Sequence, residues 1–214
     1  PTPANAPLSM AERLDPTVHA AIARSVASLS HASALMAASD WALHLAASPG
    51  HCMDLAHLAL RQGQELAAYA QARMAAGPDK EARHAVATPA QDRRFADPAW
   101  QQWPFNLVHQ SFVLTEQWWA AATHGVWGVD KHHEDMVAFA ARQFLDVFSP
   151  GNQLATNPVV LNRTLAQGGA NLARGALHLL DDARRHAAGM PPAGAENFVV
   201  GRDVGITPGK VVLK

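Results

Sequence analysis

The feature that most constrains the fold of this chain is a recurring dipeptide, a short polar residue followed by proline. It occurs at Asp15-Pro16, Ser48-Pro49, Asp97-Pro98, Ser149-Pro150 and Asn157-Pro158. The polar side chain can accept a hydrogen bond from the free N–H groups of a first helical turn. Proline at the next position loses nothing, because that N–H would be unpaired anyway. The repeated dipeptide therefore predicts a mainly α-helical chain.

Apolar residues spaced three and four apart predict three helices in the first block, roughly residues 15–76. The first helix carries Val18, Ile22, Val26 and Leu29, and the second carries Leu35, Trp41, Leu43 and Leu45. The third begins at Pro49 and is expected to reach about Met74, because Gly77-Pro78 stops it.

The second block is predicted to hold three more helices. Residues 104–123 are apolar along two stripes, which indicates a helix that is buried or contacts something apolar. Asp130 is predicted to cap the next helix, which we expect to bury Val137, Ala140, Phe144 and Val147. A last helix, about residues 160–179, is expected to run through Gly168-Gly169, where the glycines permit close helix packing.

The pattern changes after Pro192. Val200, Val204 and Ile206 predict one strand and residues 211–213 another, joined by a turn at Thr207-Pro208-Gly209-Lys210. A hairpin alone is marginally stable, so we expect it to open a sheet that these residues do not complete. The predicted division is a short N-terminal helical module (1–76), a polar linker (77–94), a main helical domain (95–190) and the first strands of a further domain (191–214).

Composition narrows the class of protein. Hydrophobic residues make up 49% and charged residues 16% of the 214, which favours a folded chain. The net charge of -1 argues against nucleic-acid binding. A single cysteine excludes an internal disulfide and fits a reducing cytoplasm. No signal peptide or transmembrane run is visible. The chain starts at Pro1 without an initiator Met, which suggests a trimmed or partial sequence.

Cys52 is the one candidate for a cysteine nucleophile. It lies in Gly50-His51-Cys52-Met53-Asp54, where Asp54 replaces the second glycine of a nucleophile elbow. A helix is expected before it, whereas that motif requires a strand. We therefore predict that Cys52 is a small core side chain and not a catalyst.

Histidines suggest metal binding, but their spacing argues against it. His44, His51 and His57 cluster, and His132-His133-Glu134-Asp135 offers four potential ligands in a row. No HExxH or zinc-type cysteine pair is present, and adjacent helical residues point about 100° apart. Gly168-Gly169 likewise lacks the strand and spacing of a phosphate loop. No catalytic, cofactor-binding or metal-binding residue is assigned.

Seven aromatic residues gather in one stretch, and two interpretations stay open. They are Trp100, Trp103, Phe105, Phe112, Trp118, Trp119 and Trp127. Core packing is favoured, because indoles dominate small cores. The alternative is an exposed apolar surface that docks a partner subunit or a polymer.

Several strings, in order, resemble the N-terminal region of polyhydroxyalkanoate synthases. A first group is Asp40-Trp41-Ala42-Leu43-His44-Leu45-Ala46 followed by Ser48-Pro49-Gly50, similar to a short N-terminal module of some of these polymerases. A second group resembles their main N-terminal domain: Asp92-Arg93-Arg94-Phe95-Ala96-Asp97-Pro98-Ala99-Trp100, Trp118-Trp119, His132-His133-Glu134-Asp135, Ser149-Pro150, Thr156-Asn157-Pro158, Gly168-Gly169-Ala170-Asn171-Leu172 and Gly201-Arg202-Asp203-Val204.

The resemblance implies an acyltransferase that polymerises 3-hydroxyacyl-CoA into polyester and releases CoA. In this family a cysteine, aided by His and Asp, carries the chain as a thioester in an α/β-hydrolase-type domain. None of the three maps onto these residues, so the 214-residue chain alone is expected to be inactive.

The resemblance also implies where the chain acts and with what. Its expected roles are homodimerisation, association with polyester granules or granule proteins, and support of the catalytic domain, in the cytoplasm at the granule surface. Substrate and polyester would be bound through the catalytic domain. The alternative is a free-standing helical adaptor that binds a granule, a membrane surface or a synthase.

Overall fold

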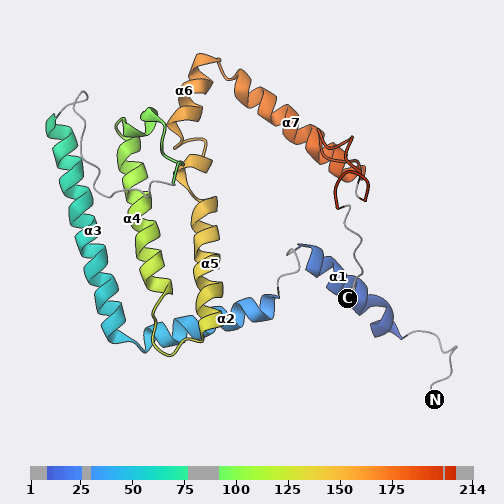
Figure 1. Cartoon of the computed structure of the whole chain (residues 1–214), viewed down its shortest axis with the longest axis horizontal. Helices are drawn as coiled ribbons and strands as arrows, with labels where there is room; N and C mark the ends of the chain where they lie inside the picture. The colour runs from blue at the N-terminus through green and yellow to red at the C-terminus, as the bar shows by residue number, and fades with distance from the viewer. Residues whose placement is uncertain (1–8, 26–29, 77–91, 200, 206–214) are drawn as a thin grey trace. The chain divides into compact units, whose positions relative to one another are not determined.

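The computed structural model describes residues 9–25, 30–76, 92–199 and 201–205 (Figure 1). It divides at Asn157/Pro158 into two compact units, which are described separately below. The first contains α1 (Met10–Ser25), α2 (His31–Ala46), α3 (Pro49–Ala76), α4 (Phe105–Thr123) and α5 (Lys131–Val147), with the 3-10 turns η1 (Pro98–Gln101) and η2 (Pro150–Asn152). The second contains α6 (Pro158–Ala166) and α7 (Ala170–Ala187). The predicted mainly helical fold is confirmed.

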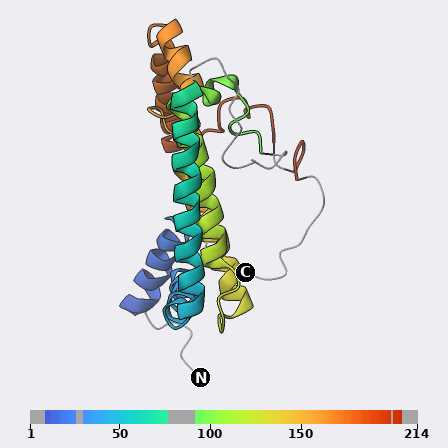
Figure 2. The same cartoon turned by 90° about the vertical axis from the view of Figure 1, so that its left-hand side faces the viewer.

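Helices α3, α4 and α5 lie side by side in that order, and α2 crosses their lower end as drawn (Figure 1). Figure 2, turned by 90°, shows α3 in front of α4, so these helices form a single layer. Helical domains usually bury their apolar stripes between two layers. A single layer leaves part of each stripe uncovered.

Side-chain hydrogen bonds join the first helical block to the second. The Trp41 indole donates to the Ala122 carbonyl (2.9 Å), and the Trp118 indole donates to the Leu55 carbonyl (3.2 Å). Asn106, which is buried, donates to the Tyr69 hydroxyl (3.1 Å). Helices α2 and α3 therefore pack on α4 and the segment that follows it within one unit.

The core of this unit lies where the segment before α4 folds back on that helix. Phe95, Trp100, Phe112 and Val113 form it, with Phe105 and Leu145 against its edge. The Phe95 ring contacts Trp100 edge-on at 4.9 Å between centroids and stacks on His109 at 4.4 Å. Asp97 fixes this segment, because its carboxylate caps η1 by accepting from the Ala99 N–H (2.8 Å).

Four of the five polar-proline dipeptides begin a helix or a 3-10 turn, as predicted. The prediction is wrong for Asp15-Pro16, because Pro16 lies inside α1. That helix begins six residues earlier at a capping box. The Ser9 hydroxyl accepts from the Glu12 N–H (3.2 Å), and the Glu12 carboxylate accepts from the Ser9 N–H (2.7 Å).

The predicted cap of α5 is confirmed, but its predicted buried face is wrong. The Asp130 carboxylate accepts from the N–H groups of His132 (2.9 Å) and His133 (3.4 Å). Phe144 and Val147, however, are 64% and 62% exposed, and Ala140 is exposed as well. The helix instead turns Ala138, Ala141 and Leu145 toward α4, and its larger apolar residues face outward.

The predicted single last helix is in fact two helices, because Gly168-Gly169 ends α6. Both glycines have positive φ (54° and 85°), which other residues adopt at a cost. The Gly169 N–H donates to the Thr164 carbonyl and the Gly168 N–H to the Leu165 carbonyl, the pattern of a Schellman cap. No atom lies within 4 Å of a Cβ built at either glycine, so close helix packing is not their role.

The structure describes only part of the expected C-terminal hairpin. Residues 201–205 form a turn in which the Gly201 N–H donates to the Val204 carbonyl (2.7 Å), with a single bridge residue at Val204 in place of a strand. Asp203 holds this turn by accepting from the Val199 N–H (2.9 Å). Val200 and residues 206–214, including the second predicted strand, lie outside the described residues.

The predicted linker also lies mostly outside the described residues, since only residues 92–94 of it are covered. None of the helices that the structure describes has both the length and the hydropathy needed to cross a membrane.

Candidate functional site

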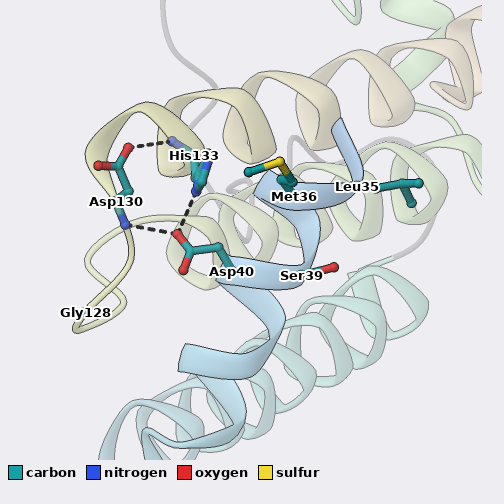
Figure 3. Close-up of a pocket in the computed structure, with 7 residues that line it drawn as sticks. All are labelled: Leu35, Met36, Ser39, Asp40, Gly128, Asp130 and His133. Carbon is teal, nitrogen blue, oxygen red and sulfur yellow. Dashed lines mark hydrogen bonds and ion pairs between the residues drawn. The ribbon is translucent and has the colours of Figure 1, made fainter. Parts of the chain in front are cut away.

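Asp40 of α2 is the centre of a polar junction with α5 (Figure 3). Its Oδ2 accepts from His133 Nδ1 (2.8 Å) and from the Asp130 N–H (3.1 Å). Its Oδ1 lies 3.0 Å from His44 Nδ1, one turn further along α2. One carboxylate thus ties α2 both to the start of α5 and to the loop before it.

These contacts determine the electrostatics of Asp40. The hydrogen bond from His133, followed by that from the Asp130 N–H, lowers the pKa of the Asp40 carboxyl below its ordinary value of 3.8. The loop approaches closely at Gly128, whose φ is +91°. A Cβ at this position would clash with the His44 ring. Glycine is therefore required here both by conformation and by space.

The junction borders an open pocket of about 690 Å³ that also contacts Leu35, Met36 and Ser39. An aspartate on the Nδ1 of a histidine is the arrangement that orients a general base. Such a base acts on a nucleophile within hydrogen-bond reach, and Ser39 points away from His133 (Figure 3). The geometry therefore supports a role in holding α2 on α5.

A second polar cluster, centred on Arg94, links α4 and α5. The Arg94 guanidinium donates to both carboxylate oxygens of Glu116 (2.8 and 2.9 Å) and to Asp92 (2.7 Å). It also reaches Asp146 of α5 at 3.2 Å and lies 5.5 Å from the centroid of the Phe112 ring. These bonds lower the pKa of the Asp92 carboxyl and raise the pKa of the Arg94 guanidinium.

The Arg94 cluster lies at a cleft of about 850 Å³. Apolar residues of both helices line this cleft, among them Val113, Trp119 and Leu145. The charges around Arg94 are paired with one another, so they link the segment before α4 to α4 and α5.

The seam between α3 and α4 is uncharged and contains two adjoining hollows. Gly63, Leu66 and Ser111 line both of them. Gln62 lines the first, is 6% exposed, and has a buried Nε2 with no hydrogen-bond partner. A buried donor left unpaired costs roughly 1–3 kcal/mol, so this one requires an explanation.

The residues singled out in the sequence analysis lie at separate positions in the structure. Cys52 is exposed near the start of α3, where its Sγ lies 3.3 Å from the Leu45 carbonyl. The prediction that it is a core residue is therefore wrong. His133 and His44 both contact Asp40. Among the described residues, no three His, Cys, Asp or Glu side chains gather into a group that could hold a metal ion.

The aromatic stretch divides between the core and the surface. Trp100 and Phe112 are buried, whereas Trp103 and Trp127 are 65% and 72% exposed. Trp119 contacts Trp118 at 5.5 Å and Trp41 of α2 at 6.4 Å between ring centroids. Core packing therefore accounts for the apolar stripes of α4, as favoured from the sequence.

Comparison with protein families identifies the group to which the chain is related. Residues 91–214 match the family model described as "Poly-beta-hydroxybutyrate polymerase (PhaC) N-terminus". The chain belongs to this family. Residues 9–51 match a second model, "Poly-beta-hydroxybutyrate polymerase N terminal". The Asp40 junction joins these two regions of the polymerase N-terminus, since Asp40 lies in one and Asp130 and His133 lie in the other.

Curated relatives are named as poly(3-hydroxyalkanoate) polymerases. The chain is 36% identical over 132 residues to a poly(3-hydroxyalkanoate) polymerase of Methylorubrum extorquens, covering 60% of this chain and 22% of the relative. It is 35% identical over 126 residues to the polymerase subunit PhaC of Rhizobium meliloti (58% and 21%), and 32% identical over 127 residues to that of Cupriavidus necator (59% and 21%). The chain thus spans about a fifth of the length of these relatives. No solved structure matches it.

Sequence reasoning missed the residues that hold this polymerase N-terminus together. Asp40, Arg94 and His133 stand in strings that carried the resemblance, but none of them was given a role. Most partners of Arg94 and the surroundings of Gln62 come from other helices. For Gln62 the available signal was a polar residue within an apolar helical face.

Proposed function

We propose that this chain is the N-terminal region of an acyltransferase that polymerises 3-hydroxyacyl-CoA into polyester and releases CoA. The observation that carries the proposal is the family match over residues 91–214, together with relatives named as polymerases. The catalytic Cys, His and Asp would lie in a part of the polymerase outside these residues. Cys52 is exposed and its Sγ contacts the Leu45 carbonyl, so we do not assign it as the nucleophile.

The region itself would serve dimerisation, granule association and support of the catalytic domain. Two uncovered apolar helix faces support this role. On α5 and at its C-cap, four residues are each more than half exposed: Phe139, Phe144, Val147 and Phe148. On α7, Leu177, Leu179 and Leu180 are each about two-thirds exposed, and the helix has no buried residue. Contiguous exposed apolar patches mark interaction surfaces in folded proteins.

Two experiments test the proposal. The purified 214-residue chain is incubated with 3-hydroxybutyryl-CoA, and free CoA is measured with a thiol reagent. We expect no more CoA release than in a blank without protein. Turnover by the chain would contradict the proposal that the catalytic residues lie outside these 214 residues. The reading frame beyond Lys214 is then determined. A G-x-C-x-G motif followed by Asp and His is the expected finding, and a stop codon there would contradict the proposal.

The alternative, a free-standing helical adaptor, was motivated by the apolar circumference of residues 105–119. Much of that surface is used inside the unit, because Phe112, Val113 and Leu114 are all buried. This helix therefore gives no specific support to the adaptor hypothesis.

A further inference from the structure

Helix α1 carries an apolar stripe of its own. Met10, Leu14 and Val18 follow one another at a spacing of four residues, and their side chains are 75%, 52% and 49% exposed. The capping box of Ser9 and Glu12 fixes the start of this helix. Among the described residues, no other helix packs extensively against α1. The helix is therefore formed, but its stripe is uncovered.

The outer face of α5 carries a matching stripe. Ala140 and Phe144 of α5 and Phe148 at its C-cap also stand four residues apart, and all three are exposed. The contact of α5 with α2 comes before this stripe, where His133 bonds to Asp40. Each stripe spans eight residue steps, or about 12 Å of helix. Rows of side chains four residues apart are the ridges that interlock in the commonest class of helix packing.

The connection between α1 and α2 determines how the two stripes can meet. In Figure 1, α2 begins on the side of α5 that faces away from α4, and α5 runs away from α2. Because α1 directly precedes α2, a docked α1 must end near the start of α2. It would therefore run antiparallel to α5. Val18 would then lie opposite Ala140, and Met10 opposite Phe148.

The chain between α1 and α2 is long enough for this arrangement. In the antiparallel register, Ser25 at the end of α1 lies level with His133 of α5. His133 contacts Asp40, which is nine residues, or about 13 Å of helix, from the start of α2 at His31. Six peptide steps separate Ser25 from His31, and they can span about 20 Å. The connection therefore permits the docking.

We propose that α1 docks reversibly on the outer face of α5 of its own chain, where the two apolar stripes cover each other. Docking supplies the second layer that helical domains normally use to bury such stripes. It does not depend on the polymerase assignment. One consequence rests on the proposed function: a docked α1 covers the face of α5 that would take part in dimerisation. The helix therefore competes with self-association.

A second copy of the chain is the competing occupant of this face. A short tether gives α1 a local concentration in the millimolar range, far above that of a second copy in a micromolar solution. An anionic lipid surface is a poorer occupant, because the stripe of Ala140, Phe144 and Phe148 contains no cation. The tether therefore favours α1 of the same chain.

Cross-linking of the full 214-residue chain tests the docking. Cys52→Ser removes the native thiol, and Thr17→Cys with Gln143→Cys then places one thiol beside each stripe. Docking brings these two thiols to the same side of the helix pair, so a short bismaleimide should join them within one chain. His19→Cys with Gln143→Cys is the matched control. The helical rotation of 100° per residue turns His19 away from α5, so this pair should react about fivefold more slowly.

Two further variants connect docking with self-association. Leu14→Glu places a charge in the middle of the α1 stripe, so it should abolish the preference for the Thr17 pair. Without the added cysteines, it should strengthen self-association about two- to fourfold in sedimentation velocity, because the face of α5 is then always uncovered. Adding Phe144→Glu should remove this gain. Circular dichroism confirms that each variant keeps its helices.

Two results would overturn the docking. One is an equal rate of cross-linking for the Thr17 and His19 pairs. The other is a cross-link that forms only between two chains, which would make a second copy the occupant. If the Thr17 pair reacts preferentially within one chain but Leu14→Glu leaves self-association unchanged, the docking holds and the competition is overturned. The CoA-release and reading-frame tests do not involve α1, so they show separately whether the polymerase assignment fails.

Discussion

Asp40 accepts hydrogen bonds from positions 90 and 93 residues further along the chain. Because these bonds lower its pKa, the ionised carboxylate is favoured in the folded state. Its stabilising contribution is therefore complete above the pKa of the unfolded chain, near 3.8, and is lost as the pH falls through the lower folded value.

This predicts a pH signature for Asp40→Asn. The variant should be less stable than the parent at pH 7, and the difference should narrow below about pH 4. Urea unfolding at a series of pH values measures the difference. A gap that does not narrow as the pH falls below about 4 would contradict the assignment to this carboxylate.

Gly128 offers a second prediction at the same junction. Gly128→Ala combines a positive φ with a clash against the His44 ring, and it should destabilise the chain by about 2–4 kcal/mol. Gly125→Ala is the matched control, because its φ is +70° but no atom lies within 4 Å of its Cβ. That variant should lose only about 1 kcal/mol. Equal losses in chemical denaturation would show that the contact with His44 has no effect.

Arg94 supports a third prediction. Arg94→Lys loses the paired bonds to Glu116 and cannot reach three carboxylates at once. Because the side chain is 35% exposed, solvent screens the interactions and the expected loss is about 1 kcal/mol. The effect should shrink in 1 M NaCl. Arg142→Lys is the control, because Arg142 lines the same cleft and forms no ion pair with the described residues, and it should change stability little.

At the level of helices, a glycine inside a helix and a glycine that ends a helix should respond differently to substitution by alanine. Gly63 and Gly175 lie inside α3 and α7, with ordinary helical φ and open space around a built Cβ. Gly63→Ala should therefore stabilise the chain by about 0.5–1 kcal/mol, mainly by restricting the unfolded state. Gly168→Ala should destabilise it, because that φ is +54°. Thermal unfolding distinguishes them, and a destabilising Gly63→Ala would contradict this reading.

The positions of most helices could be predicted from the sequence, because caps and apolar spacing are local signals. Pro49, Asp130 and Pro158 mark helix starts by features within a few residues. The faces of α5 could not be predicted, because apolar spacing shows that a stripe exists and not which neighbour covers it. The break at Gly168-Gly169 was also missed, since two glycines between apolar runs fit a packed helix as well as a cap.

The candidate sites were less predictable than the helices for the same reason. The contacts of Asp40 and Arg94 depend on residues brought together only by packing, and the unpaired amide of Gln62 is visible only once α3 lies against α4. Local sequence contains none of this information. The family resemblance, by contrast, depends on ordered strings and could be recognised directly.

At the level of the first unit, a single layer of α3, α4 and α5 leaves the outer face of α5 without a cover in the described residues. Phe144→Glu on this face should change stability by no more than about 0.5 kcal/mol, because the side chain is 64% exposed. It should weaken self-association of the chain, measured by sedimentation velocity over a range of concentrations. Phe112→Ala, in the buried core, should instead cost about 3–5 kcal/mol.

Two outcomes would contradict the assignment of dimerisation to this face. One is a parent chain that sediments as a monomer at every concentration. The other is a Phe144→Glu variant that associates as strongly as the parent.

The long-range contacts of α2 also have a consequence for synthesis on the ribosome. Trp41 bonds to a carbonyl 81 residues later, and Asp40 to a histidine 93 residues later. The ribosome adds about 5–20 residues per second, so these partners are synthesised roughly 5–20 s after α2. During that interval its apolar residues are available to chaperones. A nascent chain stalled before α5 should therefore be bound by a chaperone more strongly than one extended past it.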